Sequence, residues 1–515
     1  MALIIEIFAI PTLAALVAGV LALCAAWLIA RPSAGAPPRP PHARRWRPII
    51  GHALAYKADA AAFLSEQCRD VGAVFRLNLA GKRMVVVGAD RAAVRQIASA
   101  SEAVLSSREA TLDIGFEQTL GALNVRVGTE VHKRLVKETY GGQRLDDEVP
   151  ALHAALGRAF AAELAVLRAK RPARAEGADF EERIVVPDIL ALVRAVVLRA
   201  VIERLLGPAV LDAGGAPLVA AFMSFQDLVE DATAKAAVLP RPVALALALW
   251  PCQARRKGMS ALLIGAFEAA GYGSAAPSAG LGPWLQSFAR DGMGAPAAAE
   301  LTIGLLFAAH KNPAIGAAQA VLLALEHGGA ELDAARADAR ALHAVPDAPT
   351  LRACAALRRA ALEALRVSAH PLGAVRKVMS PSGFVVRGAC GSWAVRRGET
   401  IALTHVAVHR DAALWGRAPD EYAPRRPEWS DGGRDVASDE YRFTTFSQGV
   451  HRCPGASLAL VIVQSAAAHL LGGDFEAALP GPPPPLCFER ATLAQRRGAA
   501  SVVLAPRGAM RGARA

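Results

Sequence analysis

The ten residues from Phe446 to Gly455, FSQGVHRCPG, constrain the fold of this chain more than any other stretch. They set Phe446, Gly449, Cys453 and Gly455 in the pattern F-x-x-G-x-x-x-C-x-G. With the chain's own residue counts, chance produces such a match about 1.5 times in a thousand chains of this length. A buried structural cysteine is therefore a poor explanation, and we expect a chemical role for Cys453.

The spacing suits a cysteine thiolate that binds haem iron. A thiolate axial ligand pushes electron density onto the iron and favours cleavage of an O–O bond. Backbone N–H groups must hold such a sulfur, and glycine allows the backbone to approach closely. The run ASLALVIVQSAAAHLL after Pro454 predicts a helix, whose N-terminal dipole favours the thiolate of Cys453. Phe446 would cover the sulfur side of the haem ring.

Two motifs upstream of this loop point the same way. LEALR holds Glu363 and Arg366, which are three residues apart and so share one helix face. Between them and the loop, residues 409–429 end in EYAPRRPEW. Together with the loop, these segments resemble the E-x-x-R and F-x-P-E-R-F motifs of the cytochrome P450 family. The resemblance implies that Arg426 completes a structural triad with Glu363 and Arg366, and it places Arg425 where the family usually has an acid.

The resemblance also implies a set of residues that hold haem. Arg376 matches the arginine that pairs with a haem propionate, although a plain surface arginine is the alternative. His451 stands where many relatives place another propionate-binding group. In GTEVHKRLVKETY, His132 replaces the usual tryptophan, and the register leaves open which basic residue nearby binds the second propionate. The implied cofactor-binding set is Cys453, as axial iron ligand, with Phe446, Gly449, His451, Gly455, Arg376, His132 and Arg134.

The apolar segment 300–327 is similar to the family's long helix over the distal face of haem. The family pattern there is A/G-G-x-D/E-T, but this chain has Lys311 in place of the acid and Asn312 in place of threonine. We expect Asn312 and Ala309 to line the distal side as catalytic residues. An amide relays protons poorly, so water could deliver them instead. Alternatively, the chain resembles relatives that rearrange or dehydrate lipid peroxides. Pro313 predicts a local kink.

The N-terminal segment predicts a membrane anchor. Residues 12–30 carry no charged side chain and are long enough to span a bilayer. A signal peptide is the rival interpretation, but no basic residue precedes the apolar run. The arginines that follow the span place the rest of the chain on the cytoplasmic side of the endoplasmic reticulum membrane, as a single-pass protein. They are Arg31, Arg39, Arg44, Arg45 and Arg47.

Composition narrows the classes of function. The 58 basic and 46 acidic side chains give a formal charge of +12, which is spread along the chain and favours a solvated surface over nucleic-acid binding. Seven cysteines, an odd number with no C-x-x-C pair, argue against a disulfide framework and favour a reducing compartment. The apolar stretch 238–252, framed by prolines, predicts either a buried helix or a membrane-facing entrance.

These observations lead to one prediction of fold and domains. We expect a mainly α fold with small β-sheets, the cytochrome P450 fold, preceded by one transmembrane helix. Residues 1–30 would form the anchor, 31–48 a Pro/Arg-rich hinge and 49–515 the haem-binding catalytic domain. VFRLNLA and KRMVVVG, on either side of residues 80–82, alternate as the strands of a hairpin do.

The predicted activity is that of a haem-thiolate monooxygenase. It would use haem b to insert one oxygen atom from O2 into a lipophilic small molecule. Electrons would come from NADPH through a separate cytochrome P450 reductase, with cytochrome b5 as a further donor. Two rivals stay open: a reductase-independent isomerase or dehydratase of lipid peroxides, and a haem- or lipid-binding protein that has lost catalysis. The sequence does not identify the substrate, because fold does not dictate it.

Overall fold

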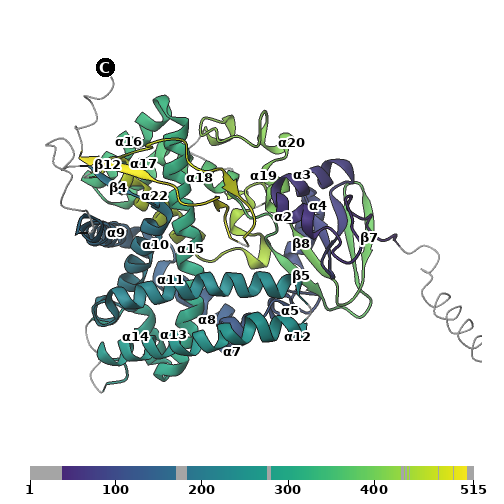
Figure 1. Cartoon of the computed structure of the whole chain (residues 1–515), viewed down its shortest axis with the longest axis horizontal. Coiled ribbons are helices and arrows are strands. Elements are labelled where there is room, and N and C mark those ends of the chain that lie inside the picture. Colours follow the sequence, from purple (N-terminus) through teal and green to yellow (C-terminus); the bar gives the residue numbers. More distant parts are fainter. Residues whose placement is uncertain are drawn as a thin grey trace, which may run out of the picture.

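The structure is a computed structural model that describes residues 37–169, 183–239, 241–274, 280–430, 441–473, 475–490 and 492–506, with Arg434, Ser438 and Asp439. The described chain is mainly helical with small sheets, as the sequence predicts (Figure 1). The predicted transmembrane segment 12–30 and Arg31 lie outside the described residues.

The longest helix, α15 (Ala295–His327), forms the centre of the helical part. Of its 33 residues, 22 are alanine, leucine, isoleucine, valine or glycine, so it can be buried on most sides. The most extensive contacts of α15 are with four helices: α10 (Ile189–Val201), α13 (Trp250–Ala269), α18 (Ala355–Val367) and α22 (Ala456–Gly472). The helix continues without interruption across Pro313.

The remaining long helices surround this centre (Figure 1). They are α8 (Gly128–Tyr140), α9 (Gln143–Ala169), α11 (Pro208–Val238), α14 (Pro283–Arg290) and α16 (Gly329–Ala344). The α11 helix is kinked at Gly215, whose φ of 54° is outside the helical range. The shorter α-helices are α2 (Ala53–Ala58), α3 (Ala60–Asp70), α4 (Arg91–Ser99), α5 (Ser107–Asp113), α6 (Phe116–Thr119), α7 (Ala122–Arg126), α12 (Arg241–Ala244), α17 (Ala348–Ala353), α19 (His405–His409) and α20 (Ala412–Trp415). The described residues also form two π-helical turns, η1 (Ile202–Leu206) and η2 (Leu245–Leu249), and three 3₁₀ turns, η3 (Pro427–Trp429), η4 (Thr444–Phe446) and η5 (Gly449–His451).

A five-stranded sheet lies beside the N-terminal helices and has the order β1-β2-β8-β5-β3. Strands β1 (Val74–Leu79) and β2 (Lys82–Val87) form the predicted antiparallel hairpin, and positive φ angles at Ala80 and Gly81 make its tight turn. Strands β8 (Thr400–Leu403), β5 (Val375–Val378) and β3 (Leu105–Ser106) extend it. The smaller sheets pair β4 (Ile184–Val186) and β9 (Phe475–Ala478) with β12 (Val502–Pro506), β6 (Phe384–Gly388) with β7 (Gly391–Val395), and β10 (Leu486–Cys487) with β11 (Gln495–Arg496).

The described part of the predicted hinge, residues 37–48, packs on the sheets. The Ala394 N–H donates to the Pro38 carbonyl at 2.9 Å, and the Ala43 N–H donates to the Arg76 carbonyl at 2.9 Å. Ala43 itself is buried in a cluster with Phe63 and Leu77. This stretch is therefore joined to the body by both backbone pairing and apolar contact.

Two of the described helices, α9 and α11, are long and apolar enough to cross a membrane. Both belong to the packed body, because α9 contacts α10 and α22, while α11 contacts α13. Their length and composition alone therefore do not identify them as membrane spans.

Candidate functional site

The loop around Cys453 is folded back on itself between η5 and α22. The Cys453 N–H donates to the Phe446 carbonyl at 2.8 Å, which closes the loop. The backbone N–H of Gly455 bonds the cysteine sulfur, and α22 begins at the next residue, Ala456. The sulfur is thus held by the backbone at the start of a helix, as the sequence predicted.

The Cys453 side chain is accessible, yet protein atoms surround it closely. It counts among the exposed cysteines, but burial raises the pKa of its thiol, while the Gly455 N–H and Arg452 oppose that rise. The sulfur is therefore reachable from open space although protein atoms crowd around it, and this burial disfavours the thiolate. A coordinating metal ion deprotonates a thiol outright.

Two glycines of the loop have different surroundings. Gly449 has a φ of +61°, and a Cβ placed there would lie 2.4 Å from the Ala98 carbonyl oxygen, so the packing of the loop on α4 requires glycine. At Gly455, no described atom lies within 4 Å of an added Cβ, and φ is an ordinary −93°. Protein packing explains Gly449 but not Gly455. The open space next to the cysteine fits a bound group that the protein itself does not supply.

Basic side chains meet at one edge of the loop. Arg376, on β5, is only 5% exposed; its Nη1 donates to the Val375 carbonyl at 2.8 Å, and its Nε has no partner among the described residues. Burial lowers the pKa of Arg376, which Glu102 opposes. His451 Nε2 lies 3.5 Å from Glu102 Oε1, and Arg376 and Lys133 both contribute to the lowered pKa of His451 after burial. At this edge, the basic side chains of Arg376 and His451 share one carboxylate among the described residues, that of Glu102.

The basic side chains of α8 have three different surroundings. Lys133 Nζ donates to the Val450 carbonyl of the loop at 3.4 Å. The His132 ring bonds the Leu301 backbone of α15, its Nε2 is buried without a partner in the described part of the chain, and burial lowers its pKa to about 4. The Arg134 guanidinium instead forms an ion pair with Asp291, which raises the pKa of Arg134.

These features together fit a haem group. The accessible thiol of Cys453 would ligate the iron, and the space at Gly455 would admit the ring. Arg376 Nε is a buried donor without a partner among the described residues, and a propionate carboxylate would satisfy it. His132 Nε2 is also buried without a partner there, and it would donate to a second carboxylate from the protonated ring.

The structure brings Glu363, Arg366 and Arg426 together in the buried centre of the α18 region. Arg366 donates to both carboxylate oxygens of Glu363, at 2.7 and 2.8 Å, and Arg426 Nε donates to one of them at 3.0 Å. Trp429 Nε1 adds a bond at 2.9 Å. Burial alone would raise the pKa of Glu363, but these donors hold it below its ordinary value. Arg366 also donates to the carbonyls of His409, Pro419 and Glu421, which fixes the segment that leads to the cysteine loop.

The helix α15, which resembles the family's helix over the distal face of haem, borders open space on one face. Ala308 is exposed in the middle of the otherwise buried α15, and Phe307, Ala309 and Asn312 beside it are half-buried. Asn312 Oδ1 accepts a hydrogen bond from the Leu493 N–H at 3.2 Å. One face of the helix near Ala308 and Asn312 therefore borders open space.

Lys311, which stands in place of the family's acid, and its neighbour His310 face the helices α10 and α11. Lys311 Nζ lies 2.6 Å from Asp227 Oδ1 and 2.7 Å from Glu230 Oε2, both on α11. His310 bonds Gln226 at 2.6 Å and the Arg194 carbonyl at 2.9 Å, and burial lowers its pKa to about 3, so it is neutral at pH 7. The buried positive charge of Lys311 therefore lies on α15, and the acidic side chains that pair with it lie on α11.

Comparison with known proteins agrees with this geometry. Residues 330–502, which include the triad, Arg376 and the cysteine loop, match the family model Cytochrome P450. The chain is similar to the cytochrome P450 family over this third of its length. The match leaves out the distal helix, which is also where the chain departs from the P450 pattern.

Curated relatives, which include several plant proteins, align with this chain over short segments. Oryzalexin D synthase of Oryza sativa subsp. japonica is 37% identical over 125 residues, and ent-cassadiene C11-alpha-hydroxylase 1 of the same organism is 35% identical over 120. Each alignment covers 23% of this chain and 23% of the relative. Indoleacetaldoxime dehydratase of Arabidopsis thaliana is 31% identical over 78 residues, 15% of each chain. The aligned part is thus less than a quarter of each relative's length.

Sequence reasoning missed the partners of the distal residues. Arg194, Gln226, Asp227 and Glu230 lie on α10 and α11, about 80 to 120 positions before α15, and belong to no motif. The one signal was the lysine at position 311 in an apolar helix, since a buried charge requires an opposite charge nearby.

Proposed function

We propose that this chain is a haem-thiolate monooxygenase of the cytochrome P450 family that inserts one oxygen atom from O2 into a lipophilic small molecule. The observation that carries the proposal is the accessible thiol of Cys453, held by the Gly455 N–H at the start of α22. One relative is named as a hydroxylase, and oxygen insertion is the chemistry we extend from it to this chain.

Under this proposal, haem b would supply the oxygen chemistry and the chain would position it. Cys453 would ligate the iron, with Phe446 and Gly449 shaping the loop around the sulfur. Arg376 and His451 would hold one propionate and His132 the other, while the pairing of Arg134 with Asp291 gives Arg134 a structural role instead. On the distal side, Ala309 and Asn312 would border the substrate. The Asn312 amide, which accepts the Leu493 N–H, would keep its own N–H₂ group for a substrate or water oxygen.

We propose further that electrons come from NADPH through a separate cytochrome P450 reductase, with cytochrome b5 as a further donor. The predicted location is the endoplasmic reticulum membrane, with the catalytic domain in the cytoplasm. An apolar edge on the segment 241–252 supports contact with lipid: Val243, Leu247 and Trp250 are exposed, Leu247 by 69%, while Leu249 and Cys252 are buried. This edge would place the substrate entrance at the bilayer.

The test is the dependence of turnover on reductase, NADPH and O2. The full chain would be reconstituted in lipid vesicles with P450 reductase and offered lipophilic probes, including ent-cassadiene, under ¹⁸O2. We expect one labelled oxygen atom in the product, and no product when NADPH or reductase is omitted. Products that form without NADPH and carry no label would contradict the proposal.

A second candidate, a reductase-independent dehydratase or isomerase, has specific support. Neither the acid nor the alcohol of the usual proton relay is present, and Lys311 is engaged with Asp227 and Glu230. One relative is also named as a dehydratase. A fatty-acid hydroperoxide is the discriminating probe: rapid conversion without NADPH, reductase or O2 favours this candidate, and inertness under those conditions rules it out.

A further inference from the structure

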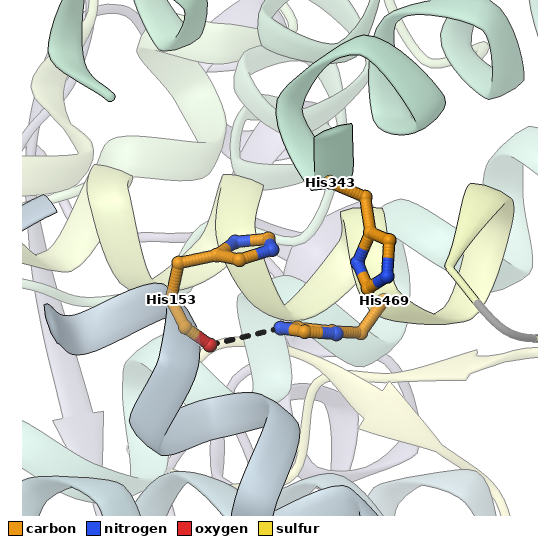
Figure 2. A group of neighbouring side chains, drawn as sticks. All are labelled: His153, His343 and His469. Carbon is orange, nitrogen blue, oxygen red and sulfur yellow. Dashed lines mark hydrogen bonds between the residues drawn. The ribbon is translucent and has the colours of Figure 1, made fainter. Parts of the chain in front are cut away.

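Three histidines from distant parts of the chain come together away from the haem site. His153 lies on α9, His343 on α16 and His469 on α22 (Figure 2). One nitrogen of each ring can be chosen so that all three lie within 4.8 Å of one another. The helices themselves pack in contact, since α22 touches both α9 and α16. The cluster is therefore fixed by the body of the fold and not by a loose surface segment.

His153 is the residue that packing alone does not explain. Its side chain is 4% exposed, and neither ring nitrogen has a hydrogen-bond partner in the described part of the chain. Leaving a buried donor or acceptor without a partner costs about 1–3 kcal/mol. Its ring stacks on that of His469 at 4.2 Å between centroids and stands edge-on to that of His343 at 5.9 Å (Figure 2). A buried imidazole without a partner of its own thus lies against two others.

The tautomer of His469 is set as in a metal-binding histidine. Its Nε2 donates to the His153 carbonyl at 3.0 Å, the bond drawn in Figure 2. A ring that donates through Nε2 carries its lone pair on Nδ1. Histidines that ligate metals commonly donate their other ring N–H to a carbonyl in this way, which orients the ring and raises its basicity.

We propose that His153, His343 and His469 form a binding site for a borderline transition-metal dication, with Zn²⁺ as the preferred ion. Three neutral imidazoles are a donor set that suits Zn²⁺ and disfavours Mg²⁺ and Ca²⁺, which prefer oxygen. Water or hydroxide completes the tetrahedron at the fourth position. Both His343 and His469 are only half-buried, so the ion can enter from the surface.

His153 has the protonation state that a metal requires. Burial, followed by the fields of His469 and His343, lowers the pKa of His153 to about 3, so this ring stays neutral over the physiological range. Neutral His153 can therefore ligate a metal without first losing a charge.

Metal binding needs a small rearrangement. In a tetrahedral zinc site with Zn–N bonds of about 2.0–2.1 Å, the nitrogens lie about 3.3 Å apart. The rings of His153 and His469 now stack at 4.2 Å between centroids, and the His343 ring stands edge-on to His469 at 5.5 Å. Zinc binding would therefore require the stacked rings of His153 and His469 to rotate apart, as well as a rotation of His343 at the end of α16.

The expected consequence is a link between three helices. Zinc would join α9 and α16 to α22, the helix that starts immediately after the cysteine loop. Binding to the folded state alone stabilises it by mass action, so the melting temperature should rise with free zinc. The site acts as a structural clamp and is independent of the proposed oxygen chemistry.

The test uses the haem-loaded full chain, stripped of metals with EDTA and titrated with ZnCl₂. We expect one Zn²⁺ per chain by calorimetry, a zinc-edge X-ray absorption spectrum with three imidazole ligands, and a higher melting temperature. His343→Gln, at the half-buried rim, should weaken zinc affinity at least tenfold and abolish the thermal shift. His153→Gln should do the same, and His327→Gln, an exposed histidine at the end of α15, should bind zinc as the wild type does.

The haem spectrum of each variant reports whether it has folded. A His343→Gln protein with the wild-type haem spectrum and the wild-type zinc affinity would overturn the proposal. So would a wild-type chain that takes up no zinc at micromolar concentrations. If His153→Gln fails to fold, His343→Gln alone decides the question.

Discussion

The region around the triad and the part of α15 near Lys311 both pair buried charges, but they do so with different residues. In the triad region, buried charges follow the family's motifs: Glu363 accepts bonds from Arg366, Arg426 and Trp429. In the distal region, the charge at the acid's position is reversed, and Lys311 meets Asp227 and Glu230. Both networks are paired, but only the first could be recognised from a motif. The family's motif therefore marks the network that positions the cysteine, whereas the acidic partners of Lys311 lie on another helix.

The largest expected effect is in the triad. Glu363→Ala removes the acceptor of four donors and leaves two buried arginines without their counter-charge. Removing one partner of a buried pair costs about 3–5 kcal/mol, so we expect a loss of at least about 4 kcal/mol in the free energy of unfolding, measured by urea titration. The control is Glu117→Ala, from an exposed pair with Arg126, which should cost less than about 1 kcal/mol.

The triad also predicts a direction of pH dependence. The pKa of Glu363 is lower in the folded chain than in the unfolded one. Its contribution is then present above the ordinary carboxyl pKa and is lost as the pH falls toward the folded value. Acid should therefore destabilise the wild type more than Glu363→Gln; equal acid sensitivity of the two proteins would contradict the assignment.

A smaller loss is expected on the distal side. Lys311→Met keeps most of the length of the side chain but leaves the buried Glu230 with only Arg490, at 3.4 Å, as a cation, at a cost of up to about 3 kcal/mol. Lys235→Met, from an exposed pair on the same α11, is the matched control and should cost less than about 0.5 kcal/mol. Similar unfolding midpoints for the two variants would show that the distal network contributes no more than a surface pair.

The two loop glycines separate packing from cofactor binding. Gly449→Ala forces a Cβ to 2.4 Å from the Ala98 carbonyl at a φ of +61°, so we expect about 2 kcal/mol of destabilisation with or without haem. Gly455→Ala meets no described atom, and should leave the stability of the apoprotein within about 0.5 kcal/mol of wild type. Its haem affinity, followed by the Soret absorbance, should fall. Normal haem uptake by Gly455→Ala would mean that the open space serves another purpose.

A smaller effect on stability than that of Gly449→Ala is expected at Asn312. Asn312→Thr loses the amide acceptor of the Leu493 N–H, at a cost of about 1 kcal/mol, and supplies the hydroxyl of the usual relay. If the chain is a monooxygenase, the share of NADPH that ends in product should rise, measured as product formed per NADPH consumed. An unchanged ratio would mean that protons reach the distal face by a route that does not pass position 312.

The sequence was sufficient where function depends on local spacing. The hairpin of β1 and β2, the helix after Cys453 and the E-x-x-R pair are set by residues a few positions apart. It was insufficient where contacts join distant segments. Neither the pairing of Arg134 with Asp291, nor that of Lys311 with α11, nor the meeting of His153, His343 and His469 leaves a periodic or motif signal. Such contacts depend on how helices pack, which no single segment encodes.

The central claim, that Cys453 supplies a thiolate to haem iron, is tested most directly by the optical spectrum of the dithionite-reduced protein with carbon monoxide. Wild type and Cys453→Ser would be compared at equal haem content. We predict a strongly red-shifted Soret band in the wild type and its absence in Cys453→Ser. A folded, haem-loaded wild type without that band would contradict the account and favour a haem- or lipid-binding protein without catalysis.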